Sequence, residues 1–290
     1  MVLVSLQNVS FTYEYADLPA LTNVSLELES GLVYGVVGLN SSGKSTLCSL
    51  IRGLIPAFHQ GELSGTVTVL GKDLAEWEPA DLSRSIGYVF QNPFTQISGI
   101  RDTVFEEIAL GLENLGVERD EMIERVLEVV EQLGIESIIA KNPNDLSGGQ
   151  RQKVAFAAII AMDADFIVID EPTSQLDPDA SDAVFGIIRT LKEQGKSIIL
   201  VEHKMDLLAE FADRLIVMHE GTVVLEGDVR TVLLSGVLDQ VGVPRPEVTE
   251  LARRLDAIGR PLDTMPITRA EAHEALSRQL MEESYVDHAH

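Results

Sequence analysis

Cysteine, lysine and long apolar runs are scarce in this chain of 290 residues. The single cysteine, Cys48, excludes an intramolecular disulfide framework and any metal cluster built on several cysteines. The longest apolar stretches, such as Val154–Met162, are much shorter than the roughly 20 residues that a membrane-spanning helix needs. The first residues also lack the basic segment and apolar core of a secretory signal. We therefore expect a soluble, cytoplasmic polypeptide.

Positive charge is also in short supply. The chain has 22 Lys and Arg residues against 46 Asp and Glu residues, so its formal net charge is −24. Binding to nucleic acid or anionic lipid requires a basic surface, and the sequence contains no basic cluster, so we expect no nucleic acid partner. The acidity suits a cytoplasm of high salt, where self-repulsion is screened, and it equally suits an acidic protein of an ordinary cell. The melting temperature measured against KCl concentration distinguishes the two.

The distribution of apolar residues predicts an α/β fold. Two alternating runs, Leu3–Val9 and Thr22–Glu29, are typical of antiparallel strands. Short apolar segments predict buried strands at Val33–Val37, Ile86–Phe90, Phe166–Ile169, Ser197–Val201 and Leu215–Met218. Helical spacing occurs between them at Thr103–Leu115, Asp120–Leu133, Gly149–Ala161 and Asp179–Glu193. We therefore predict a mostly parallel sheet with an antiparallel β subdomain and a helical insertion at about 92–160.

The C-terminal part differs in pattern, so we divide the chain into a main domain at 1–234 and an extension at 235–290. The stretch Ser235–Pro246 contains two glycines and two prolines and is typical of a linker. A helix is expected at Pro246–Ile258, and another from Thr268, which Glu271 can complete as a capping box. The first helix has one apolar face, formed by Val248, Leu251, Leu255 and Ile258. We expect this small helical extension to pack on the main domain or on a second subunit.

The segment Gly38-Leu39-Asn40-Ser41-Ser42-Gly43-Lys44-Ser45 fits the phosphate-loop pattern G-x-x-x-x-G-K-[ST]. It lies between an apolar strand and a helix, which is the context that the pattern requires. Its glycines allow backbone N–H groups to surround phosphate oxygens, and the helix N-terminus favours negative charge. Lys44 adds a positive charge, and Ser45 supplies a hydroxyl ligand for Mg²⁺. We predict that Gly38–Thr46 binds the phosphates of a nucleotide.

A second element is the apolar segment Phe166–Asp170 with Glu171 after it. A strand that ends in a carboxylate is typical of an aspartate that orients Mg²⁺ beside a phosphate loop. Glu171 extends beyond the strand, where it can act as general base on water attacking the γ-phosphate. Asp-Glu before Pro172 is also a common turn, and the phosphate loop is what favours the functional interpretation.

Between these elements, Leu146-Ser147-Gly148-Gly149-Gln150 places a serine and two glycines at the start of a helix. Backbone donors and a hydroxyl at a helix N-terminus can bind an anion. The chain already contains a complete phosphate loop, so this second device can serve a nucleotide held by another subunit. Taken alone, the pentapeptide is more simply an ordinary helix cap.

In this order, the phosphate loop, LSGGQ and FIVIDEP resemble the motifs of the ATP-binding subunit of ABC transporters. The resemblance covers about residues 2–233, and it implies a P-loop NTPase core of the ABC ATPase type that binds and hydrolyses ATP with Mg²⁺. It also implies roles for further residues. Gln91 is similar to the Q-loop glutamine, which contacts Mg²⁺ and the attacking water, and His203 to the switch histidine, which contacts the γ-phosphate. Tyr13 matches the aromatic residue that stacks on adenine.

The segment Ser174–Asp177 resembles the D-loop of the same family. The resemblance implies that Asp177 and Leu146–Gln150 contact ATP bound by a second subunit. The implied magnesium ligands are Ser45, Gln91 and Asp170, and the implied catalytic residues are Glu171, His203 and Gln91.

Other segments resemble the ATPases of energy-coupling factor importers: Ile55–Gly61, Gln91–Pro93, Phe105–Gly111, Glu113–Gly116 and Val201–Met205. This resemblance implies a homo- or heterodimer with a second ABC ATPase subunit. It also implies a membrane coupling protein, bound beside Gln91 and Thr95–Glu107, and a substrate-binding membrane protein. The chain is then expected on the cytoplasmic side of the cell membrane, where ATP-dependent dimer closure drives uptake of a vitamin or transition-metal ion.

Two positions depart from the family pattern. Ser41 replaces the usual glycine and must adopt a backbone conformation that glycine takes more easily. Gln175 replaces the usual alanine near the dimer interface. Neither change removes a catalytic group, so we expect hydrolysis. The alternatives are a soluble ABC ATPase acting on ribosomes or DNA, which the single cassette and the negative charge disfavour, and a nucleotide-gated ABC subunit with weak hydrolysis.

Overall fold

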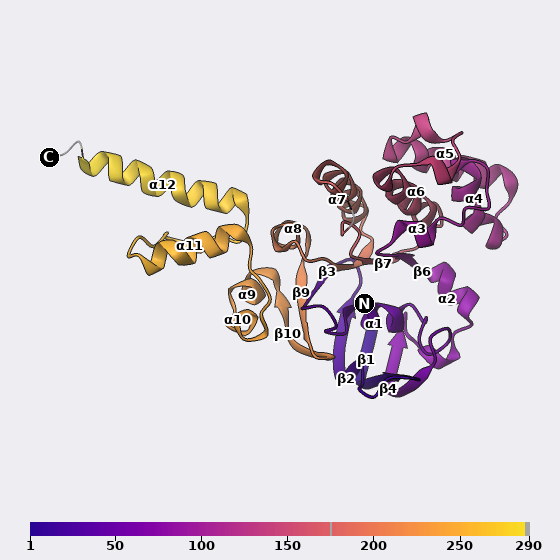
Figure 1. Ribbon diagram of the computed structural model, residues 1–290, viewed down its shortest axis with the longest axis horizontal. Helices are drawn as coiled ribbons and strands as arrows, with labels where there is room; N and C mark the ends of the chain where they lie inside the picture. The colour runs from indigo at the N-terminus through magenta and orange to yellow at the C-terminus, as the bar shows by residue number, and fades with distance from the viewer. Residues whose placement is uncertain (175, 288–290) are drawn as a thin grey trace.

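The computed structural model describes residues 1–174 and 176–287, with the backbone alone for residues 93, 94 and 281–287. Two β-sheets occupy the centre of the body, helices cover them, and the last two helices extend away from it (Figure 1). Gln175, the D-loop residue singled out above, lies outside the described residues.

The smaller sheet is antiparallel, with its strands in the order β2 (Leu21–Glu29), β1 (Val2–Tyr13), β4 (Gly61–Val69) and β5 (Lys72–Asp73). The predicted pairing of the two N-terminal strands is confirmed, and β1 continues past the expected end to Tyr13. A register shift around Asn8, whose φ is +52°, moves the alternation by one residue, so that Leu6 and Val9 are both buried. This bulge hides the second half of the strand from a simple period-two pattern.

The larger sheet has the strand order β10 (Thr222–Asp228), β9 (Arg214–His219), β3 (Val33–Val37), β8 (Ser197–Val201), β7 (Phe166–Asp170) and β6 (Ile86–Val89). The five strands from β9 to β6 are parallel, and β10 is antiparallel to β9. The prediction of a mostly parallel sheet is confirmed. Parallel strands bring their carboxyl ends to the same edge, so the segments that follow β3, β6, β7 and β8 meet there.

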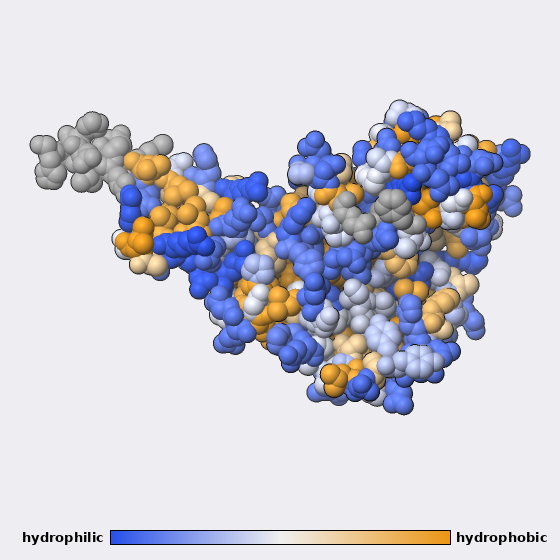
Figure 2. All heavy atoms as spheres, in the orientation of Figure 1, coloured by the Kyte–Doolittle hydropathy of each residue, from blue (hydrophilic) through white to orange (hydrophobic). Residues whose placement is uncertain are grey.

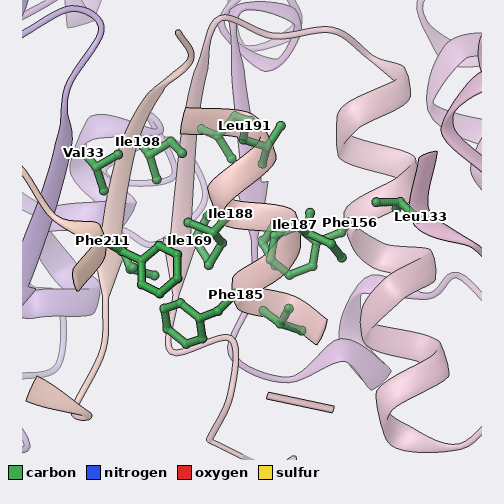
Figure 3. Close-up of a cluster of buried hydrophobic side chains, with 14 of the residues drawn as sticks. Val33, Leu133, Phe156, Ile169, Phe185, Ile187, Ile188, Leu191, Ile198 and Phe211 are labelled. Carbon is green, nitrogen blue, oxygen red and sulfur yellow. The ribbon is translucent and has the colours of Figure 1, made fainter. Parts of the chain in front are cut away.

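Both faces of the larger sheet are buried, which explains why its strands are apolar without alternation. Phe166 and Val168 face helix α1 (Lys44–Ile51) and the smaller sheet, in a core that also contains Leu47. Ile167 and Ile169 face the opposite core. There they meet α7 (Pro178–Glu193) and α8 (Met205–Phe211), whose side chains fill the space between helix and sheet (Figure 3).

A helical subdomain is inserted between β6 and β7, at the upper right of Figure 1. It contains α3 (Pro93–Gln96), α4 (Val104–Asn114), α5 (Arg119–Leu133), two short 3₁₀ turns at Glu136–Ile138 and Pro143–Asp145, and α6 (Gly148–Ala161). Before β6, a 3₁₀ turn (Leu74–Glu76) packs beside β4, and α2 (Pro79–Ser85) packs beside β6. Thr103 caps α4 in a capping box with Glu106, and Ser147 caps α6 in the same way with Gln150.

The C-terminal part contains α9 (Val229–Leu234), α10 (Val237–Val241), α11 (Glu247–Ala257) and α12 (Arg269–Asp287). The stretch 235–246, expected as a linker, contains α10 and is packed: Leu238 is fully buried. Arg245 donates to the backbone carbonyls of Leu233 and Ser235 and pairs with Asp239. Here glycine ends a short helix, since Gly242 has a φ of +70°, and the prediction of a linker does not hold.

Helices α11 and α12 form an arm that projects from the body (Figure 1). The side of α11 that is buried carries Thr249 and Ala252, while Leu251 is 45 % exposed and Ile258 is 70 % exposed. The extension contacts the main domain through other residues, since Leu238, Val243 and Ile267 belong to the larger core, whereas this apolar face of α11 stays partly exposed. Packing on a second subunit stays a prediction. Figure 2 shows the apolar side chains gathered on the arm.

At the start of α12, the backbone N–H of Glu271 donates to the Thr268 hydroxyl, as expected. The Glu271 carboxylate accepts the N–H of Ile267, and it pairs with Arg230 of α9. Among the described residues, no helix is both long enough and apolar enough to cross a lipid bilayer.

Candidate active site

The loop Gly38–Thr46 joins the carboxyl end of β3 to the N-terminus of α1. Close packing requires glycine at two positions. A Cβ on Gly38 would lie 2.3 Å from the carbonyl oxygen of Met218, and one on Gly43, whose φ is +102°, would lie 2.8 Å from that of Ala20. Glycine thus lets the loop turn tightly into the N-terminus of α1, a helix end that favours negative charge such as phosphate.

Lys44 is 5 % exposed, and its ammonium group donates to the carbonyl oxygens of Gly38 (2.9 Å) and Leu39 (3.0 Å). Burial lowers the pKa of Lys44, which Glu171 and Asp170 partly offset by their charges. The ammonium group therefore spans the loop and faces the same cavity as the helix N-terminus. An anionic ligand would gain a strong partner there, because the local dielectric is low.

Ser41 has a φ of +63°, so the conformation expected from its departure from glycine is observed. For a residue with a Cβ this left-handed conformation costs about 1–2 kcal/mol. The neighbouring Ser42 is buried, and the N–H of Gly221 donates to its carbonyl oxygen at 3.0 Å. The surrounding structure therefore holds the loop in shape despite the strain at Ser41.

Tyr13, at the end of β1, lies next to the start of α1. Its hydroxyl is 3.2 Å from the Thr46 hydroxyl, and its ring meets that of Phe11 edge to face, with centroids 4.9 Å apart. These contacts hold the ring at the side of the loop.

Asp170 ends β7 and is 6 % exposed. Its Oδ2 accepts a hydrogen bond from the Tyr88 hydroxyl at 3.3 Å, whereas its Oδ1 is buried and has no hydrogen-bond partner. Burial raises the pKa of Asp170, and the hydroxyl of Ser45 partly offsets the rise. A buried carboxylate oxygen without a donor is costly, and a cation at this position would satisfy it.

Glu171 brings two other predicted residues together. Its Oε1 lies 2.8 Å from His203 Nε2, and its Oε2 accepts a hydrogen bond from Gln91 Nε2 at 2.7 Å. The three residues follow β7, β8 and β6, and they meet because these strands are parallel neighbours in the sheet. Glu171 has a φ of +46°, a left-handed conformation that is uncommon outside glycine and that often marks a functional position.

One open cavity of about 650 Å³ joins Glu171 and its two partners to the phosphate loop, whereas Tyr13 and Asp170 are not among its lining residues. It is lined by the loop residues Asn40, Ser41, Ser42, Gly43, Lys44, Ser45 and Thr46 together with Gln91, Glu171 and His203. The cavity thus combines a cationic, N–H-rich wall with a carboxylate, an amide and an imidazole opposite. This arrangement can hold a phosphate chain and place a water molecule at its end.

The predicted second anion-binding element lies elsewhere. Ser147 and Gln150 form the capping box of α6, and together with Gly148, Gly149 and Asp177 they line a separate cavity of about 540 Å³. Leu146 is buried beside them, and Asp177 caps α7 by accepting the N–H of Ala180 at 2.8 Å. Within one chain, therefore, the structure does not bring this element to the phosphate loop.

Sequence reasoning missed Tyr88 as a member of the site. It lies on β6, is 6 % exposed, and its hydroxyl contacts the carboxylate of Asp170 on the neighbouring strand β7. Burial raises the pKa of Tyr88 far above its usual value, so the hydroxyl stays protonated and donates a hydrogen bond to Asp170. Its closeness to the predicted Gln91 was the only available signal, and the pairing of β6 with β7 could not be read from the sequence.

The sequence of this chain is similar to those of known ATP-binding proteins. The family model described as "ABC transporter" matches residues 21–174. The energy-coupling factor transporter ATP-binding protein EcfA1 of Enterococcus faecalis is 39 % identical over 256 residues, which are 86 % of this chain and 88 % of that protein. EcfA2 of Acetivibrio thermocellus is 33 % identical over 284 residues, which are 95 % of this chain and 99 % of that protein.

Among solved structures, the chain is similar to cbiO1 from Clostridium perfringens, described as part of the ABC transporter complex cbiONQ. The TM-score is 0.72 at 27 % sequence identity, and the match covers 89 % of this chain and 97 % of the other. The similarity thus extends beyond the residues of the family model.

Proposed function

This chain belongs to the ABC transporter family as an ATP-binding, ATP-hydrolysing subunit, and on that premise we propose that it drives an importer of the energy-coupling factor type. The observation that carries the proposal is the convergence of Glu171, His203 and Gln91 on the phosphate loop in a single cavity. The relatives support the assignment to this subgroup, because two energy-coupling factor ATP-binding proteins match the chain over most of their own length.

In this proposal, Gly38–Thr46 holds the ATP phosphates and Tyr13 stacks on the adenine. The backbone N–H groups and Lys44 neutralise the β- and γ-phosphate charge. Glu171 accepts the proton of the attacking water. His203 contacts both the γ-phosphate and Glu171, and so fixes their relative position. Gln91 orients the same water from the other side.

The residues present fit Mg²⁺, which prefers oxygen ligands. Asp170 contributes a buried carboxylate oxygen without a donor, and Ser45 contributes a hydroxyl beside it. Gln91 completes the proposed set with its side-chain oxygen. When bound, Mg²⁺ neutralises charge on the phosphates and so stabilises the transition state of phosphoryl transfer.

We propose that two such subunits act together. One subunit contacts the γ-phosphate bound by the other through Leu146, Ser147, Gly148, Gly149, Gln150 and Asp177. In their own subunit all of these except the buried Leu146 line a different cavity. ATP binding then closes the dimer and hydrolysis reopens it. The second subunit is an identical chain or a related ABC ATPase.

The membrane partners are a coupling protein and a substrate-binding protein that takes a vitamin or a transition-metal ion. We place the coupling protein beside the segment 95–107, on the cytoplasmic side of the membrane. Two apolar side chains are exposed around this segment: Ile100 is 75 % exposed and Phe90 is 39 % exposed. Ser98 is fixed between them, because the buried Glu107 carboxylate accepts its N–H and its hydroxyl.

Purification of the tagged chain from detergent-solubilised native membranes tests the proposal. We expect membrane proteins and a second ABC ATPase to co-purify, with Mg·ATP hydrolysis in the complex. Ile100→Asp should release the membrane proteins and leave nucleotide binding intact, whereas Lys44→Ala should retain them and lose hydrolysis. Recovery of ribosomal or DNA-bound proteins instead would favour the non-transport alternative, and a complex that binds ATP without turnover would favour the weak-hydrolysis alternative.

A further inference from the structure

Glu202, directly before His203, is a buried carboxylate that the catalytic roles above do not use. It follows β8 and is 4 % exposed. Its Oε1 accepts the backbone N–H of His203 at 2.8 Å and that of Lys204 at 3.2 Å. Its Oε2 accepts the hydroxyl of Thr173 at 2.8 Å, and Thr173 is itself only 2 % exposed. Both oxygens are therefore engaged by neutral donors from two different loops.

These contacts close a ring between the ends of β7 and β8. Thr173 lies two residues after Glu171, whose N–H donates to the carbonyl of Val201. The His203 imidazole returns to the Glu171 carboxylate at 2.8 Å. Glu202 therefore adds a side-chain link between the backbone that carries the histidine and the backbone that carries the glutamate.

Positioning matters here because Glu171 has a strained backbone, with a φ of +46°, and the side chain of His203 is 45 % exposed. Strained conformations persist only where the surrounding structure holds them. A hydroxyl side chain at position 202 is too short to bridge both loops, whereas a carboxylate can accept three donors at once.

We infer that Glu202, together with Thr173, is a positioning residue that holds His203 against Glu171 for ATP hydrolysis. The inference rests on the proposed roles of Glu171 and His203. Glu202 itself is not among the residues that line the cavity of Glu171 and the phosphate loop. A buried carboxylate that only stabilised the end of β8 would alter stability, but it would not act through the imidazole.

The experiment compares Glu202→Ala, Glu202→Gln and Thr173→Val in the purified full-length chain with its co-purifying ATPase partner. A displacement of about 1 Å in a catalytic group can cost on the order of 100-fold in rate. We expect Glu202→Ala to lower kcat by roughly 10- to 100-fold with KM for Mg·ATP within about twofold. Glu202→Gln should restore most of the rate, because its amide oxygen accepts the two N–H groups and its nitrogen donates to Thr173.

A double-mutant cycle with His203→Ala separates positioning from a structural role. If Glu202 acts through the imidazole, Glu202→Ala lowers kcat no further in the His203→Ala background. The inference would be overturned if the double variant lost the product of the two single-variant losses in kcat. It would also be overturned if Glu202→Ala changed only KM. If Glu202→Ala does not fold, the same cycle with Thr173→Val, which keeps the side-chain volume, decides the question.

Three control variants distinguish the possible outcomes. Thr249→Val removes a comparable buried hydroxyl, whose hydrogen bond to the Pro266 carbonyl measures 2.7 Å, and should leave kcat unchanged. Glu171→Gln and His203→Ala report on the proposed function: if neither lowers kcat, the proposed function fails. If both lower kcat and the Glu202 and Thr173 variants do not, only the positioning role fails.

Discussion

Replacing Glu171 by glutamine separates the chemistry of this side chain from its structural contacts. In the wild type, Glu171 contacts His203 Nε2 at 2.8 Å and Gln91 Nε2 at 2.7 Å. In the variant, the amide oxygen can accept from Gln91 while the amide nitrogen donates to His203 in its other neutral tautomer. Both contacts survive, so we expect a change in stability below about 1 kcal/mol.

The catalytic loss should be much larger. An amide cannot accept the proton of the attacking water, and a general base contributes about 10²–10⁴-fold to the rate. We expect kcat to fall by about 10³-fold, which corresponds to about 4 kcal/mol in activation free energy. Phosphate release at saturating Mg·ATP measures kcat. Size-exclusion chromatography of the same variant with Mg·ATP should show a closed dimer, because ATP binds and is not consumed.

Glu220→Gln is a matched control. Glu220 lies in the turn between β9 and β10, outside the candidate site, and its φ of +47° is close to that of Glu171. The same substitution in the same backbone conformation should leave kcat unchanged. The reasoning is refuted if Glu171→Gln keeps kcat within tenfold of the wild type. A variant that stays monomeric with Mg·ATP, alone and with its natural partner ATPase, would contradict the proposed dimer.

Three further predictions concern the phosphate loop and the C-terminal part of the chain. Lys44→Ala removes a cation that makes charge-assisted hydrogen bonds of about 1.5–3 kcal/mol each. Calorimetry should therefore show that the affinity for Mg·ATP falls about 100-fold or more. An unchanged affinity would contradict the phosphate-loop role. Ser41→Gly relieves the strain of a left-handed φ of +63° but also increases the conformational freedom of the unfolded chain. Urea unfolding should therefore show that the free energy of unfolding rises by about 0.5 kcal/mol. A decrease of more than about 1 kcal/mol would refute the strain argument. Arg245→Ala removes two hydrogen bonds to backbone carbonyls, which together contribute about 3 kcal/mol. Amide hydrogen exchange in α10 and α11 should therefore accelerate. Arg254→Ala, which changes an exposed arginine of the arm, is the control and should leave the exchange rates unchanged.

Much of the fold was predictable because its signals are local. The apolar strands Val33–Val37 and Ser197–Val201 appear as predicted, since strands buried on both faces lack polar residues. The missed strands β4 and β10 carry exposed residues and glycines, and the bulge at Asn8 hides the end of β1. Helix α10 was missed for a related reason: it is only five residues long and lies among the glycines and prolines that indicated a linker.

The sequence by itself determined the phosphate loop and the two carboxylates at the end of β7, Asp170 and Glu171, because a glycine spacing and a strand end are properties of a few consecutive residues. Tertiary structure decided the rest of the site. Gln91 meets Glu171 across 80 positions, and His203 meets it across 32, only because β6, β7 and β8 are neighbours in a parallel sheet. The contact of Tyr88 with Asp170, the bridge from Glu202 to Thr173 and the exposed face of α11 likewise depend on which elements pack together, and a linear pattern does not encode that order.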